Sequence, residues 1–187
     1  MAPTPPPITR RTLRRDDAFP LRSEALGFCF HSPDEREYWA RDACYLLSPE
    51  AVAAMEAAAR ELNGMIAAAV DRVVARGDYH AFGFTPRLAA LVEASHRLAE
   101  PSLYGRFDFR LGPDGSVKLF EFNAETPAAL LEAAADQLAW FEETPPGPHT
   151  RPGSDQWNGI DDALVARWPQ MNLPRMIHFS AERDRED

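Results

Sequence analysis

Residues 104–123 read YGRFDFRLGPDGSVKLFEFN, and this stretch constrains the fold more than any other part of the chain. Two phenylalanines and a leucine alternate with charged residues, a Gly-Pro-Asp-Gly break follows, and a second segment runs from Val117 to Asn123. Period-two alternation on both sides of a Gly-rich turn is the usual signature of a β-hairpin. The chain is therefore expected to contain an antiparallel sheet built around this stretch.

Two hairpin registers fit the turn, and both gather the same polar residues. If residues 112–115 form the loop, Arg106 lies opposite Glu121, whereas a tighter turn places Asp108 opposite Glu121. A slip of one residue would separate these side chains and mix them with the phenylalanines. In either register one face is apolar and the other carries Arg106, Asp108, Glu121 and Asn123.

This polar set suits a divalent cation bound together with phosphate. Mg²⁺ takes oxygen ligands, usually one or two carboxylates, while water and substrate phosphates complete its shell. Arg106 beside the carboxylates would meet a phosphate or a developing oxyanion with its fixed fork of donors. A solvated hairpin also has one charged face, so the pattern alone leaves an ordinary surface as the alternative.

Length and charge narrow the function classes. A chain of 187 residues is long enough to bury one sizeable core. Its formal net charge of −9 argues against a general nucleic-acid surface. No apolar run reaches membrane-spanning length and residues 1–20 lack the apolar centre of a secretory signal, so a cytoplasmic location is expected. Cys29 and Cys44 lack zinc-ligand spacing; we expect two buried free thiols, with one disulfide left open.

Helix-start signals predict the scaffold around the hairpin. Ser48-Pro49-Glu50 opens a long amphipathic helix that runs to Gly77, and Thr85-Pro86 opens a second that ends by Pro101. The apolar stripe of the long helix suits packing within the chain, and a coiled-coil dimer face is the alternative. The predicted fold is α+β: long amphipathic helices packed on a small, mainly antiparallel sheet that contains the hairpin.

A third helix start follows the second strand directly. Residues 124–127 read Ala-Glu-Thr-Pro, so the helix N-terminus would lie beside Asn123 and add free backbone N–H groups that favour an anion. A fourth helix is expected over 158–168 and a strand over 173–180. Residues 1–20 are expected to be a flexible tail and residues 21–187 a single domain. Within it, the aromatic-rich segment 21–45 predicts a compact cap with His31 in a structural, hydrogen-bonded role.

Several of these segments resemble the glutathionylspermidine synthase family. They are GRFDF, then KLFEFNAETP with the following L-x-E-A-A-A-x-Q-x-x-W-F, and the upstream ALGFCFHSPDEREYWARDACYLLS. The resemblance covers the chain from about Ala25 to Asp187 and implies the N-terminal, pre-ATP-grasp portion of an ATP-grasp-type ligase. Such a ligase makes an acyl phosphate from a carboxylate and ATP, and an amine then attacks it.

The resemblance also implies roles for individual residues. Arg106 would support the transition state and contact the nucleotide, while Asp108, Glu121 and Asn123 would bind the Mg²⁺ that holds ATP. Glu125 and Thr126 fall in the segment that helps to bind the peptide substrate, but the family usually has Asp where Glu125 stands. Ala128 lacks a side-chain hydrogen-bonding group, which makes substrate identity the weakest part of the comparison.

Two functions are therefore expected as alternatives. In the first, the chain is the N-terminal part of a carboxylate-amine ligase whose partners are a small peptide or amino-acid carboxylate, an amine and a separate C-terminal ATP-grasp lobe. Mg²⁺ and ATP would need that absent lobe for full binding, because Lys118 is the only lysine and no GxxxxGK loop is present. In the second, the chain is a non-catalytic ligand- or protein-binding module derived from such a ligase.

Overall fold

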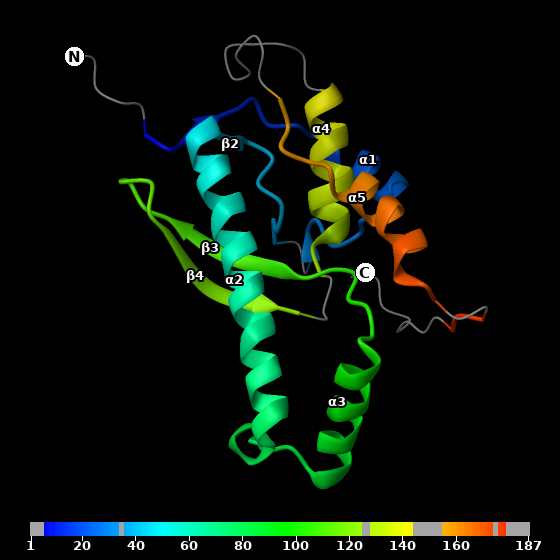
Figure 1. Ribbon diagram of the computed structural model, residues 1–187. Coiled ribbons are helices and arrows are strands. Elements are labelled where there is room, and N and C mark those ends of the chain that lie inside the picture. Colours follow the sequence, from blue (N-terminus) through cyan, green and yellow to red (C-terminus); the bar gives the residue numbers. More distant parts are fainter. Residues whose placement is uncertain (1–5, 34–35, 125–127, 144–154, 174–175, 179–187) are drawn as a thin grey trace.

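The computed structural model describes residues 6–33, 36–124, 128–143, 155–173 and 176–178. Figure 1 shows two small antiparallel sheets, with the long helix α2 lying across the second one and a group of shorter helices beside it. The sheets consist of β1 (Ile8–Thr12) with β2 (Ala43–Leu47) and of β3 (Arg106–Leu111) with β4 (Val117–Asn123). The α-helices are α1 (Phe19–Ala25), α2 (Pro49–Arg76), α3 (Pro86–Leu98), α4 (Gln137–Glu143) and α5 (Ile160–Arg167). The α+β prediction is confirmed.

Helix α2 has the ends that its sequence predicts. The Ser48 hydroxyl accepts a hydrogen bond from the Ala51 amide at 3.1 Å, Pro49 occupies the first turn, and Gly77 ends the helix with φ of 68°. A left-handed residue after the last turn favours glycine, which has no Cβ to clash. The 28 residues span about 42 Å, enough to pass the hairpin and project beyond it (Figure 1).

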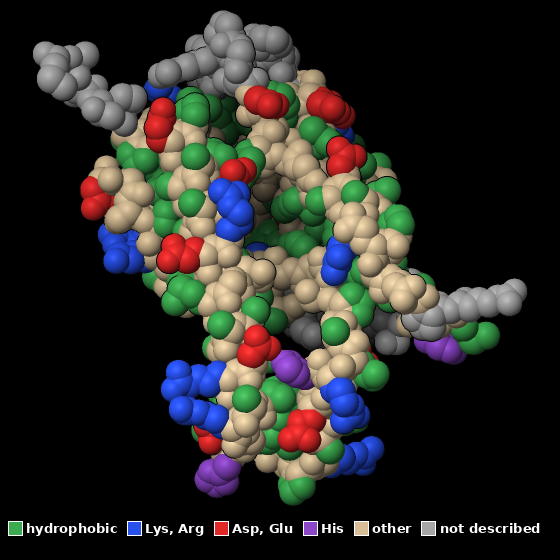
Figure 2. Space-filling view, viewed as in Figure 1, with side chains coloured by type: hydrophobic (Ala, Val, Ile, Leu, Met, Phe, Trp, Pro, Cys, Tyr) green, Lys and Arg blue, Asp and Glu red, His purple; other side chains and the backbone are tan. Residues whose placement is uncertain are grey.

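Helix α3 returns beside the projecting end of α2. The Thr85 hydroxyl accepts from the Leu88 amide at 3.2 Å, as the Thr-Pro start predicts. Much of the apolar surface of this helix pair faces solvent: Met65 is 59% exposed, Leu91 60% and Leu98 67%. Figure 2 shows these helices with hydrophobic side chains at the surface between charged ones. Most of the apolar stripe predicted for α2 is half-buried, and these exposed side chains lie outside that stripe.

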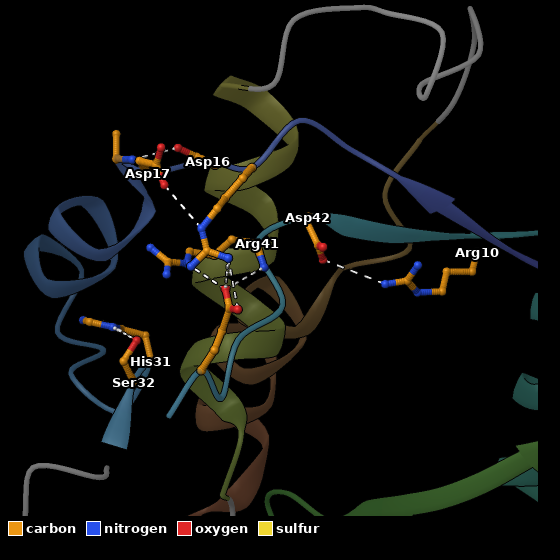
Figure 3. Close-up of polar contacts among 10 residues, drawn as sticks. Arg10, Asp16, Asp17, His31, Ser32, Arg41 and Asp42 are labelled. Atoms are coloured by element: carbon orange, nitrogen blue, oxygen red, sulfur yellow. Dashed lines mark hydrogen bonds and ion pairs between the residues drawn. The ribbon is translucent and has the colours of Figure 1, made fainter. Parts of the chain in front are cut away.

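The N-terminal segment differs from the flexible tail expected through residue 20. Residues 8–12 form β1, which pairs with β2 in the register Ile8↔Leu47 to Thr12↔Ala43. An edge strand tolerates arginines because its outward side chains stay in water. Arg10 also forms an ion pair with Asp42 at 3.8 Å (Figure 3), so an acid from the facing loop balances part of the basic segment.

The aromatic cap is confirmed. Phe19 is 3% exposed and stacks on Trp39 with ring centroids 5.0 Å apart, while Phe28 is 2% exposed and meets the same indole at 6.1 Å. His31 packs edge-on against the rings of Phe19 and Phe28 and makes two hydrogen bonds, one with Ser32 (Figure 3) and one with Glu24, both at 3.1 Å. His31 is thus a structural residue, as predicted.

Two arginines hold the Glu37 carboxylate at the edge of the cap. Arg41 Nε donates to Oε1 at 2.9 Å and Arg15 Nη1 donates to Oε2 at 3.1 Å. Figure 3 labels Arg41 beside the dashed contacts of this cluster. These hydrogen bonds lower the pKa of Glu37 to about 2, because both favour the ionised form.

Glu37→Gln is expected to change how stability depends on acid. A depressed folded-state pKa means that the ionised carboxylate contributes stability above its unfolded pKa of about 4.5, and that this contribution disappears as pH falls toward 2. The variant should therefore lose stability at pH 7 and show a shallower decline between these values. Urea unfolding at several pH values measures it; parallel pH profiles for both proteins would contradict the ion-pair account.

The third helix begins later than predicted. Residues 125–127 lie outside the described residues, Ala128 and Ala129 form a turn, and Ala129 has φ of 67°. A helix cannot run through a left-handed residue, so the described helix starts at Leu130 and its N-terminus is not adjacent to Asn123. The expectation of helical N–H groups directly beside Asn123 was wrong.

A π-helical segment, Glu132–Asp136, precedes α4. Such a segment leaves main-chain carbonyls without their usual α-helical donors. The Asn158 side-chain amide, from the loop before α5, donates to the carbonyls of Ala133 and Ala134 at 3.0 Å each. This long-range contact ties the loop to the segment, and burial raises the pKa of Asp136 at its end.

Helix α5 and the short 3₁₀ turn Trp168–Met171 confirm the fourth predicted helix. The strand expected over 173–180 is absent from the residues of that range that the structure describes, 173 and 176–178. Cys29 and Cys44 are both free, but Cys29 is exposed rather than buried. Cys44 is half-buried, and burial raises the pKa of its thiol.

Candidate functional site

The β3–β4 hairpin follows the tighter predicted register at its open end and neither predicted register near its turn. At its open end Arg106 pairs with Asn123 and Asp108 with Glu121, as the tighter turn predicts. Toward the turn Phe109 pairs with Leu119, so Phe120 is an extra residue on β4 without a partner on β3. This β-bulge resets the alternation of β4 by one residue.

The bulge sorts the side chains of the hairpin cleanly. Phe107 pairs with Phe122, not with Phe120 as the wider register predicted, and their rings stack with centroids 4.4 Å apart. Phe109 stacks on Phe107 at 5.7 Å. Gly105 allows this packing, since a Cβ there would lie 3.0 Å from the Phe122 ring. The opposite face carries the four predicted polar residues.

These four polar residues converge. Arg106 Nε donates to Asp108 Oδ1 at 2.8 Å and Nη2 donates to Oδ2 at 3.3 Å, a two-pronged contact. Arg106 Nη2 also lies 3.8 Å from Glu121 Oε1, and the Asn123 amide donates to this same oxygen at 3.0 Å. One arginine thus contacts two carboxylates that face each other across the strands and balances one of their two negative charges.

The arginine sets the electrostatics of the site. Hydrogen bonds from Arg106, followed by one involving Glu121, lower the pKa of Asp108, so this carboxylate is ionised at neutral pH. The same hydrogen bonds raise the pKa of Arg106. Arg106 and Asp108 are each about one-third exposed, at 32% and 36%, so solvent screens the pair and ligands have access to it.

Backbone and neighbouring side chains also hold the arginine. Arg106 Nη1 donates to the Ala128 carbonyl at 2.9 Å, so an acceptor from the following turn faces the site where helical N–H donors were expected. Tyr38 of the cap lies near Arg106 and Glu132, and burial, followed by the charge of Glu132, raises its pKa. Sequence reasoning assigned Tyr38 to the cap alone and gave Glu132 no role in the site.

The donor set fits a hard cation assisted by other ligands. The described residues contain no group of three or more His, Cys, Asp or Glu side chains placed to hold a metal. Asp108 and Glu121 nevertheless supply two carboxylates, and Asn123 adds a carboxamide oxygen. Mg²⁺ accepts such a partial set when water and phosphate complete its shell. Glu125 and Thr126, predicted to bind substrate, lie outside the described residues.

Comparisons with known proteins identify the family of the chain. The sequence profile described as "Glutathionylspermidine synthase preATP-grasp" matches residues 10–187. The chain belongs to this family. A Haemophilus influenzae protein whose name is given as "Putative acid--amine ligase" is 34% identical over 190 residues.

The extent of the match differs between the two chains. The alignment covers 94% of this preATP-grasp chain but 47% of the Haemophilus influenzae protein. The chain thus spans about half the length of this curated relative. Among the residues that the structure describes, no helix is both long and apolar enough to cross a membrane.

Proposed function

We propose that the polar face of the hairpin is the Mg²⁺- and ATP-binding part of an ATP-dependent carboxylate-amine ligase. The observation that carries the proposal is the convergence of one arginine, two carboxylates and a carboxamide from two paired strands. Family membership and the name of the Haemophilus influenzae relative support the same class of reaction. Both free thiols, Cys29 and Cys44, suit a reducing compartment, and the cytoplasm is the proposed location.

The reaction forms a C–N bond in two steps. A substrate carboxylate oxygen attacks the γ-phosphorus of ATP and the bond from this phosphorus to the β–γ bridging oxygen breaks, so ADP leaves. The amine nitrogen then attacks the acyl carbon, phosphate leaves with the bonding electron pair, and the nitrogen loses a proton. When bound, Mg²⁺ neutralises phosphate charge and holds the phosphates in line.

In this proposal each residue of the polar face has one task. Asp108, Glu121 and Asn123 hold the metal through oxygen atoms. Arg106 turns from the Asp108 carboxylate to phosphate oxygens and stabilises the charge that develops during transfer. Glu125 follows the site directly in sequence, and with Thr126 it is proposed to contact a peptide or amino-acid carboxylate substrate.

A further lobe is part of the proposal. A closed, water-poor site is needed for phosphoryl transfer, whereas Arg106, Asp108 and Glu121 are all partly exposed. Exposed apolar side chains on α2 and α3 also offer surface that a further segment would cover. The half of the relative's length that this chain does not match is the proposed source of that lobe, and we expect the chain alone to be inactive.

The second candidate is a non-catalytic module that keeps the polar face for a cation, a ligand or a protein partner. The contact that favours it is the one between Arg106 and Asp108. Because this arginine occupies both oxygens of the Asp108 carboxylate, that carboxylate is already paired without any ligand. A module of this kind would need neither ATP nor a second lobe.

Calorimetric titration with Mg²⁺ and ATP separates the two candidates. We expect the chain to bind Mg²⁺ with ATP and the variant Asp108→Ala with Glu121→Ala to show no measurable binding, because two charged metal ligands are lost. Asp161→Ala with Asp162→Ala removes the same charge from the exposed first turn of α5 and should bind like the parent. Absence of binding in the parent chain would favour the non-catalytic module.

A further inference from the structure

The polar face of the hairpin extends beyond the four predicted residues. Arg110 lies two residues after Asp108 on β3, so its side chain is on the same face. Its direct partner on β4 is Lys118. The face thus carries an acidic pair, Asp108 with Glu121, followed toward the turn by a basic pair, Arg110 with Lys118.

The bulge at Phe120 is what brings the lysine to this face. Strict alternation from Glu121 would place Lys118 on the apolar side, opposite Phe109 or Leu111 in the two predicted registers. The extra residue instead pairs Lys118 with Arg110 and sends its neighbours Val117 and Leu119 to the apolar side. The only lysine of the chain is therefore positioned next to an arginine by an irregularity of the strand.

Two cations directly opposite each other destabilise an antiparallel pair. Arg110 and Lys118 are both exposed, and neither forms an ion pair or a side-chain hydrogen bond with any residue that the structure describes. The acid nearest the turn, Asp114, accepts hydrogen bonds from the Ser116 hydroxyl at 2.7 Å and from the Ser116 amide at 3.0 Å. These hydrogen bonds, and to a smaller extent the charge of Lys118, lower the pKa of Asp114. Asp114 therefore balances Lys118 only at a distance, and no acid of the described residues contacts both cations as Arg106 contacts both carboxylates.

The spacing of the two pairs fits a metal-bound polyphosphate. Two residues along a strand correspond to about 7 Å, the length of a short phosphate chain rather than of a single ion. A divalent cation at the acidic pair would share phosphate oxygens with the carboxylates, and the next phosphate would reach the basic pair. Charge-assisted hydrogen bonds from arginine and lysine are the usual way that proteins hold phosphate oxygens.

We propose that Arg110 and Lys118 form a polyphosphate-binding pair that extends the metal site along the hairpin. The inference rests on the proposed function, because it takes the metal to be held by Asp108 and Glu121. With Arg110 and Lys118, this chain would itself supply cations that neutralise phosphate. Its ligand is the phosphate chain of a nucleoside triphosphate, with inorganic tripolyphosphate as the other source of the same chemistry.

The test is a calorimetric titration of the chain with inorganic tripolyphosphate in the presence of Mg²⁺. Arg110→Ala with Lys118→Ala should weaken binding by about tenfold or more, because charge-assisted contacts are lost. Arg87→Ala with Arg97→Ala removes the same charge from exposed positions on α3, which lies away from the hairpin in Figure 1, and should bind like the parent. Equal affinities for all three proteins would overturn the proposal.

Parallel titrations distinguish the two proposals and the two ligand sources. If the parent chain does not bind Mg²⁺, the metal site itself is contradicted. If the parent chain binds Mg²⁺ but replacing Arg110 and Lys118 does not change the affinity for tripolyphosphate, only the basic pair is contradicted. ATP is expected to bind at least as tightly as tripolyphosphate. If ATP binds more weakly, the nucleoside triphosphate is rejected as the ligand.

A second variant tests the repulsion without any ligand. Lys118→Glu replaces a like-charge pair with an opposite-charge pair and should raise Tm by about 1–4 °C. Mg²⁺ with tripolyphosphate should raise Tm of the parent chain and have a smaller effect on Lys118→Glu. A Tm for this variant equal to or below that of the parent would show that Arg110 and Lys118 do not repel each other and would remove the electrostatic basis of the proposal.

Discussion

Phe28→Ala is expected to lower the free energy of unfolding by about 3–5 kcal/mol. Phe28 is 2% exposed and meets the rings of Trp39, Tyr38 and His31 at centroid distances of 6.1, 6.3 and 6.4 Å. Truncation leaves a cavity among side chains that also pack on α1, so the cap cannot collapse without moving the helix. Urea unfolding followed by circular dichroism measures the loss.

Phe120→Ala is the matched control. The same atoms are removed, but Phe120 is 72% exposed at the bulge of β4, so stability should change by no more than about 0.5 kcal/mol. Equal losses in the two variants would contradict the assignment of the core to the cap. A loss below 1 kcal/mol for Phe28→Ala would show that its ring contacts do not hold the cap together.

Local signals in the sequence were sufficient for the scaffold. Ser48 and Thr85 predict helix starts because a hydroxyl accepts a hydrogen bond from an amide three residues ahead, and Gly77 predicts an end because it tolerates positive φ. Each of these interactions is made within one turn of helix. Neighbouring residues therefore contain all the information that the prediction needs.

Features that depend on contacts between residues far apart in the sequence could not be predicted from local signals. β1 exists because Ile8 to Thr12 pairs with a strand more than thirty residues later, and the segment by itself reads only as basic and polar. The late start of the third helix depends on Ala129, an alanine with positive φ, which local propensity disfavours. The turn is stabilised by the hydrogen bond that the Ala128 carbonyl accepts from Arg106, 22 residues earlier in the sequence.

The candidate site shows both situations within one hairpin. Alternation placed Arg106, Asp108, Glu121 and Asn123 on one face, and the structure brings them together. The bulge was missed because both predicted registers assumed uninterrupted pairing. A usable signal was present: strict alternation put two apolar residues, Val117 and Leu119, on the polar face with Glu121, and only an extra residue between them and Glu121 removes that conflict.

Arg106→Ala is expected to shift the binding of metal and of nucleotide in opposite directions. Arg106 now occupies both oxygens of Asp108, at 2.8 and 3.3 Å, so Mg²⁺ without phosphate must compete with a guanidinium for that carboxylate. Removing the guanidinium frees the ligand and removes a repelling charge; at this exposure we expect Mg²⁺ alone to bind about tenfold more tightly. Calorimetric titration with Mg²⁺ alone measures the change.

With ATP present, the same variant should bind Mg²⁺ and ATP more weakly than the parent chain. Once a phosphate is bound, the arginine no longer competes with the metal but contacts phosphate oxygens, and losing such a charged contact typically weakens binding by about tenfold to a hundredfold. Arg10→Ala is the control, because its partner Asp42 belongs to the β1–β2 side of the molecule and the charge change is the same. If Arg106→Ala weakens Mg²⁺ alone and Mg²⁺ with ATP equally, the arginine only positions Asp108, and the proposed exchange of its carboxylate for phosphate is wrong. If the variant instead binds Mg²⁺ alone more tightly and Mg²⁺ with ATP more weakly, Arg106 must pair with Asp108 in the empty site and with phosphate in the occupied site. A chain with a single lysine would in this way use one arginine for both kinds of anion.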